Sequence, residues 1–130
     1  MTRLERAIGT GWIAGVLLIA SGCGAGTRPE VADATQARAA LSAALDAWKA
    51  GEKPEVLAQR SPPIHVKDVD WDGGFRLVDY KSDAEGKLVG YDMNYPVDLE
   101  LKSPKGSSVK KKAVYTVTTR PELLVSRQEG

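Results

Sequence analysis

The second half of the chain alternates apolar and polar side chains over long stretches. Odd positions from 89 to 101 are all apolar or aromatic, and the even positions between them are polar, proline or glycine. A period of two places alternate side chains on opposite faces, so residues 87–102 are expected to form a half-buried antiparallel strand. Pro96 lacks a backbone donor, which predicts a bulge or a sheet edge beside it. Similar patterns predict strands at residues 75–81, 109–119 and 123–127.

A helical period precedes these strands. Residues 33–50 repeat an apolar side chain every three or four positions, as an amphipathic helix does. The apolar face consists of Ala37, Leu41, Leu45 and Trp48. Asp33 and Gln36 have the spacing of a capping box, Gly51 fits the position after the helix end, and a short second helix is expected at residues 54–59.

Helices followed by antiparallel strands indicate an α+β fold. We expect the long helix to pack on a curved antiparallel sheet of about four strands. Its contact on the sheet should be the face of the long strand that carries Tyr91, Tyr95 and Leu99.

The N-terminal segment has a different pattern. Arg3 and Arg6 form a basic start, and residues 7–27 carry no charge. The most apolar part, residues 12–20, would span about 14 Å as a helix, which is under half of a bilayer core of roughly 30 Å. A basic start, a short apolar run and a small-residue exit are typical of a secretory signal.

The sequence at the end of this segment, Ala20-Ser21-Gly22-Cys23, resembles the lipobox of bacterial lipoproteins, although Ala20 stands where Leu is usual. The resemblance implies cleavage before Cys23 after a lipid has been attached to its sulfur. Gly24, where the family's inner-membrane retention signal is Asp, favours the outer membrane if the cell has one. Two alternatives stay open: ordinary cleavage near Gly22 or Ala25, which releases a secreted protein, and an uncleaved anchor.

These patterns divide the chain into three parts. Residues 1–22 are expected to be the signal peptide, and residues 23–32 a lipid-attached flexible tether rich in glycine. Residues 33–130 are expected to form a single α+β domain. The expected location is the cell envelope, outside the cytoplasm.

Charge and cysteine content restrict the partners. The chain of 130 residues has 18 basic and 17 acidic side chains, and removal of residues 1–22 leaves 16 of each. A neutral domain lacks the basic excess that displaces counterions from phosphates, so no nucleic acid is expected. Cys23 is the single cysteine, which excludes an intramolecular disulfide and a thiolate metal cluster. The expected partners are the membrane, through the lipid, and a protein.

The order of elements also resembles the cone-shaped fold of nuclear transport factor 2-like and SnoaL-like proteins. The similarity is carried by residues 44–51, 54–57 and 113–119 and covers roughly residues 33–128. The superfamily includes isomerases, cyclases, dehydratases and many non-catalytic modules. The resemblance therefore does not choose between an enzyme and a binding module.

Two groups of side chains are candidates for a site. Carboxylates at positions 1, 3, 5 and 12 of one segment have the spacing of a calcium-binding EF-hand loop. They are Asp68, Asp70, Asp72 and Asp79. Because Pro62 and Pro63 exclude the entering helix, we favour a polar turn with Trp71 packed beneath it, and expect neither a metal nor another cofactor.

Aromatic side chains with polar tips form the second group, which could line a small-molecule pocket between helix and sheet. The group comprises Trp48, Tyr80, Tyr91, Tyr95 and Tyr115. The same residues would also form an ordinary core, which we favour. Neither a carboxylate nor a histidine occurs at the odd positions from 89 to 101, which argues against catalysis. We expect a non-catalytic binding or interaction module; the alternative is a small-molecule carrier or a cone-fold enzyme.

Overall fold

The structure is a computed structural model that describes residues 31–82 and 85–128. The expected signal peptide, Cys23 and most of the expected tether lie outside the described residues. Three helices are described: α2 (Ala34–Lys49), α3 (Pro54–Ala58) and α4 (Val69–Asp72). The strands are β1 (Ile64–Lys67), β2 (Arg76–Lys81), β3 (Lys87–Val89), β4 (Asp92–Lys102), β5 (Ser108–Thr118) and β6 (Leu123–Arg127).

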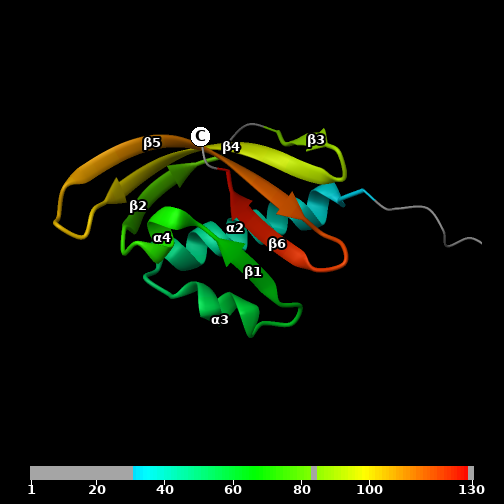
Figure 1. Cartoon of the computed structure of the whole chain (residues 1–130), viewed down its shortest axis with the longest axis horizontal. Coiled ribbons are helices and arrows are strands. Elements are labelled where there is room, and N and C mark those ends of the chain that lie inside the picture. The colour runs from blue at the N-terminus through cyan, green and yellow to red at the C-terminus, as the bar shows by residue number, and fades with distance from the viewer. Residues whose placement is uncertain (1–30, 83–84, 129–130) are drawn as a thin grey trace, which may run out of the picture.

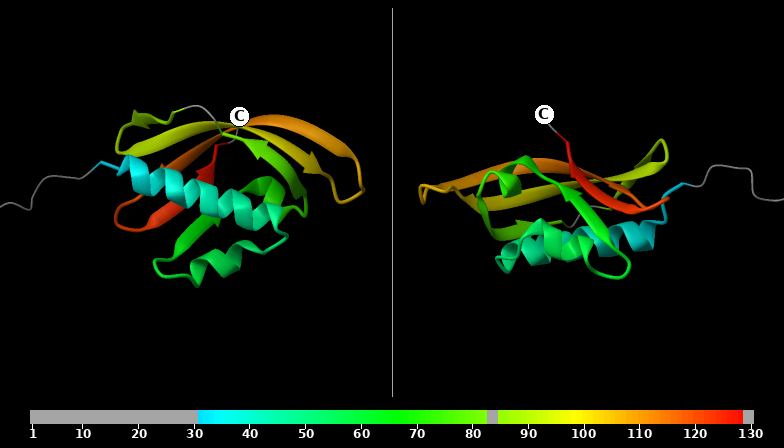
Figure 2. Two further views of the ribbon diagram at one scale, coloured as in Figure 1. Left: turned by 180° about the vertical axis from the view of Figure 1, so that it is seen from behind. Right: turned by 60° about the horizontal axis from the view of Figure 1, so that its bottom comes forward.

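The strands form one curved sheet in the order β1-β6-β5-β4-β2, with β3 paired to β4 beside this path. The sheet bends into a half-barrel, and α2 lies along its concave side (Figures 1 and 2). The α+β class is therefore confirmed. Within the described part of the chain, no helix has the length and apolar character needed to cross a membrane.

The expectation of about four antiparallel strands is wrong, because the sheet has six strands and β1 runs parallel to β6. One extra strand arises where residues 87–102 divide into β3 and β4. Gly90 has a φ of 66°, a left-handed conformation that suits a tight turn, and it interrupts the alternation there. The other extra strand, β1, has only four residues, too few to show a clear period.

The long helix is confirmed with a boundary shift of one residue at each end. The Asp33 carboxylate accepts a hydrogen bond from the Gln36 amide at 2.9 Å, as an N-cap should. Gly51, with a φ of 87°, follows the helix end. The apolar face is buried against β1, β2, β5 and β6. Trp48 stacks on Trp71 of α4 with ring centroids 5.3 Å apart.

The interior contains most, but not all, of the odd positions expected on the buried face of the long strand. Tyr95 and Leu99 are buried, whereas Tyr91 is exposed. The expected packing of α2 against Tyr91 is therefore wrong, because Tyr91 belongs to the turn between β3 and β4 rather than to either strand.

Pro96 lies in a part of β4, residues 95–97, that pairs with β5 but with neither β2 nor β3. It pairs with Val114 of β5, while β3 pairing stops at Asn94 and β2 pairing begins at Asp98. The sheet edge expected beside Pro96 is thus present. The register shift that marks a bulge is instead in β2, between Leu77 and Asp79.

Candidate functional site

The space between α2 and the sheet is filled with side chains. Trp48, Tyr95 and Tyr115, three of the aromatic residues considered for a pocket, are at most 3% exposed. The largest fully buried side chains around them are Leu41, Leu45, Leu57, Leu101, Val97, Val117 and Val125. Tyr80 instead lies at the rim of the core, where its hydroxyl donates a hydrogen bond to Asp46 of α2 at 2.7 Å.

A network of charged side chains is buried beside this core. The carboxylates of Asp68 and Asp70 both accept hydrogen bonds from Nη1 of Arg127, at 3.1 and 2.6 Å. Lys111 Nζ donates to Asp70 at 2.9 Å, and the Tyr115 hydroxyl donates to Asp68. Two carboxylates therefore face two cations, which join the start of α4 to β5 and β6.

The local sequence explains why the two carboxylates point inward. Asp68 is the N-cap of α4, and its side chain accepts hydrogen bonds from the amides of Asp70 and Trp71 at 2.9 and 3.3 Å. This cap fixes the first turn of the helix. Trp71, which stacks on Trp48, holds the helix against the core and so turns Asp70 toward Arg127.

The contacts within the network favour the ionised forms of Asp70 and Arg127 and the neutral form of Tyr115. Burial opposes ionisation of Asp70, but hydrogen bonds from Lys111 and Arg127 outweigh it and hold the pKa of this carboxyl below its usual value. Burial, together with the charge and hydrogen bond of Asp68, raises the pKa of the Tyr115 hydroxyl. Burial lowers the pKa of the Arg127 guanidinium, but the hydrogen bond to Asp70 and the charge of Asp68 outweigh it, so this pKa is raised. The ion pairs of Arg127 and Lys111 with the two aspartates therefore link α4 to β5 and β6.

The four carboxylates with EF-hand spacing do not converge. Asp68 and Asp70 belong to the buried network, whereas Asp72 lies at the exposed end of α4 and Asp79 accepts a hydrogen bond from Lys49 at 3.1 Å. Over residues 31–82 and 85–128, no three His, Cys, Asp or Glu side chains are grouped as metal ligands. His65, the single histidine, is exposed and 3.9 Å from Glu122.

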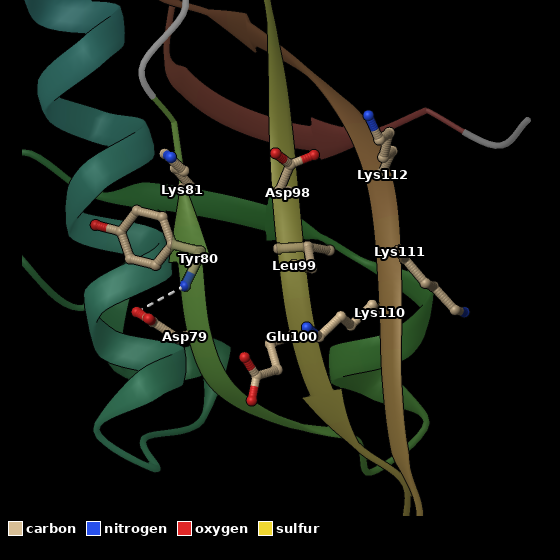
Figure 3. A pocket seen from close by; sticks show the side chains of 9 residues that line it. All are labelled: Asp79, Tyr80, Lys81, Asp98, Leu99, Glu100, Lys110, Lys111 and Lys112. Carbon is tan, nitrogen blue, oxygen red and sulfur yellow. Dashed lines mark hydrogen bonds between the residues drawn. The ribbon is translucent and has the colours of Figure 1, made fainter.

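The convex face of the sheet carries a shallow pocket of about 400 Å³ over β2, β4 and β5 (Figure 3). Asp98 and Glu100 of β4 lie directly opposite Lys112 and Lys110 of β5. Figure 3 shows Lys110 directed toward Glu100. Opposite charges across neighbouring strands stabilise their pairing. This pocket is therefore the groove over a charge-alternating sheet surface. Its lining has four lysines and three carboxylates, and one of the lysines, Lys111, is paired with Asp70.

An exposed apolar cluster that was not predicted from the sequence lies at one end of the molecule, and we name it the hairpin patch. It consists of Val31, Leu88, Val89 and Tyr91, which are 48–58% exposed. The amide of Ala32 donates a hydrogen bond to the Tyr91 carbonyl at 2.9 Å, which joins the start of the described chain to the hairpin. The adjacent apolar residues Leu88 and Val89, which break strict alternation, are the one signal in the sequence that could have indicated it.

Comparison with known proteins adds no constraint on this site. No protein-family model matches the chain, and no curated protein or solved structure matches it. The hairpin patch, the buried network and the filled interior are therefore interpreted from their own residues.

Proposed function

We propose that the protein is a lipoprotein of the bacterial cell envelope, anchored by lipid on Cys23, whose domain is a non-catalytic interaction module. The proposal joins two features: the lipobox-like end of the N-terminal segment and a domain whose interior is filled while one end exposes apolar side chains.

The interaction role is supported mainly by the contrast between an interior filled with side chains and a surface that exposes apolar side chains at one end. An enzyme or carrier of the cone type needs a space between helix and sheet, with ionisable groups reaching into it. Here that space is occupied by buried aliphatic and aromatic side chains, and the buried carboxylates Asp68 and Asp70 are both paired with Arg127. A cluster of half-exposed apolar side chains at one end of a small domain instead favours contact with another surface.

The proposed tether keeps this domain near the membrane. Seven residues lie between Cys23 and Val31, so the eight backbone steps would place Val31 at most about 29 Å from the anchored residue. More than one acyl chain on Cys23 would give stable attachment, since one chain alone binds a bilayer only marginally. The membrane is thus the first partner, and a second partner would have to be reached from this position.

The relationship to nuclear transport factor 2-like and SnoaL-like cone proteins is part of the proposal. It is supported by the long helix α2 on the concave side of a curved sheet. A small-molecule carrier is the second candidate. It is favoured by a pocket of about 450 Å³ at the first turn of α2, beside Arg38, Met93 and Tyr95. A small molecule retained by the whole protein in native mass spectrometry would favour the carrier.

Metabolic labelling with an alkyne fatty acid tests the anchor. The wild-type protein should incorporate the label, and Cys23→Ser should abolish incorporation because the acceptor sulfur is gone. Ser21→Ala is the matched control, since it keeps a small residue beside the cleavage site and should be labelled like the wild type. Equal labelling of Cys23→Ser, or no labelling of the wild type, would contradict the anchor. Membrane fractionation is a poorer readout, because a variant that keeps residues 1–22 would stay bound through its apolar leader.

A further inference from the structure

We propose that the hairpin patch inserts into the surface of the bilayer that holds the anchor, so that the domain docks on the membrane through the tip of β3 and β4. This inference rests on the proposed lipid anchor, because it uses the tether to bring the patch to the bilayer. It goes further by assigning a membrane-contacting surface to the folded domain itself.

The hairpin tip presents apolar side chains in more than one direction. Leu88 pairs with Met93 and Val89 with Asp92, and successive residues of a strand point to opposite faces, so Leu88 and Val89 emerge on opposite sides. Tyr91 follows in the turn. A surface for a flat protein partner needs apolar side chains on one face only. A tip that is apolar on both faces suits an element surrounded by its partner, as the interfacial layer of a bilayer surrounds an inserted loop.

The patch lies where the chain enters the domain. The hydrogen bond from Ala32 to Tyr91 holds residue 32 against the turn, and Val31 adds its own apolar side chain at this point. Figure 1 shows the β3–β4 turn and the start of α2 at the same end of the molecule. With at most about 29 Å of chain to Cys23, this end is the part of the domain that the anchor would hold nearest to the lipid.

The chemistry of the tip fits the interfacial region. A tyrosine has an apolar ring and a polar hydroxyl, a combination that is enriched at the level of lipid headgroups. Lys87 and Asp92 flank the apolar residues with one charge of each sign, and a lysine stem can extend its ammonium to the headgroups. The balance of charge means that insertion should not need anionic lipid and should change little with salt.

The test places a fluorophore at the tip of the lipidated protein. With Cys23 blocked by lipid, Val89→Cys supplies the only free thiol for an environment-sensitive dye. The protein is reconstituted into phosphatidylcholine vesicles with and without lipids that carry a quencher near the headgroup. Val56→Cys on α3 is the matched control, because Val56 is comparably exposed and α3 lies on the opposite side of the domain from β3 in Figures 1 and 2.

The dye at residue 89 should be quenched at least about threefold more than the dye at residue 56, because only the tip enters the layer that contains the quencher. Adding Leu88→Ser and Tyr91→Ser to Val89→Cys should remove most of this difference. Circular dichroism and the fluorescence of Trp48 and Trp71 report whether each variant is folded. Both exchanged residues are about half exposed, so the fold should persist.

Three results would overturn the inference. Weak quenching at both positions, in protein that is lipidated and bound to vesicles, would refute the inserted tip and leave the anchor intact. Equal and strong quenching at both positions would mean non-specific contact. A dye at residue 89 that is unquenched on vesicles but shielded in native envelopes would assign the patch to a protein. If mass spectrometry shows that Cys23 carries no lipid, the proposed function itself fails, which is a separate result.

Discussion

Arg127 is the residue on which the buried network depends most. Its side chain is 10% exposed, and a single nitrogen, Nη1, contacts Asp68 and Asp70. Arg127→Met retains much of the aliphatic volume and removes the charge. Asp68 would keep its hydrogen bonds from Tyr115 and from the start of α4, but it would lose its cation. Asp70 would keep only Lys111, whose side chain is 37% exposed.

The expected size of the effect follows from burial. Removing one partner of a buried ion pair destabilises a protein by about 3–5 kcal/mol, because the remaining charge stays buried without compensation. Lys111→Met, the matched control, removes a partly solvated cation and should cost about 1 kcal/mol or less. A domain of about 100 residues has a total stability of roughly 5–15 kcal/mol. The arginine exchange should therefore remove a large part of it.

Urea unfolding followed by tryptophan fluorescence measures both variants. The stacked pair of Trp48 and Trp71 is close to the network and should report its loss. With a slope of about 1–1.5 kcal/mol per molar urea, the midpoint should fall by roughly 2–5 M for Arg127→Met and by about 1 M or less for Lys111→Met. Equal shifts, or a shift below about 1 M for Arg127→Met, would refute the view that this guanidinium compensates two buried carboxylates.

Three further results are expected. The folded state lowers the pKa of Asp70, so its stabilisation is present above the usual carboxyl pKa and is lost as the pH falls through the lowered value. The stability gap between wild type and Asp70→Asn should be constant above about pH 5 and shrink below about pH 4. A gap that stays constant in urea unfolding at low pH would contradict this. Burial and Asp46 raise the pKa of Tyr80 to about 12, and Asp46→Asn should lower it in an ultraviolet titration, where no change would count against that contact. Gly86→Ala should cost about 1–3 kcal/mol, because the added Cβ would overlap the Tyr95 ring; an unchanged thermal midpoint would show that the ring can move aside.

The elements that the sequence predicts well are those whose apolar pattern repeats over many residues. The helix over residues 34–49 and the two longest strands each repeat their pattern over more than ten residues, so burial of one face determines their type. The division between β3 and β4 depends on the conformation of Gly90 alone. The parallel pairing of β1 with β6 joins residues 64 and 123, and no local pattern carries that pairing.

The buried network, too, depends on contacts between distant parts of the chain that no local pattern shows. Asp68 and Asp70 stand out in the sequence as closely spaced carboxylates, but spacing alone suggests calcium. Their partners Lys111 and Arg127 are 41–59 residues further along the chain, and only the paired strands β5 and β6 bring them near. The sequence predicts a buried Tyr91 only when the alternation of apolar and polar positions is continued through the turn. Its exposure depends on where the strand begins, which periodicity locates poorly.

Under the proposed function, the mature protein begins at a lipid-bearing Cys23. Intact-mass spectrometry of the protein purified from its native envelope tests this most directly. We expect a polypeptide of residues 23–130 with the added mass of glycerol-linked acyl chains at its first residue. A mass that corresponds to a chain still starting at Met1 with a free thiol, or to an unmodified chain cut elsewhere, would contradict it.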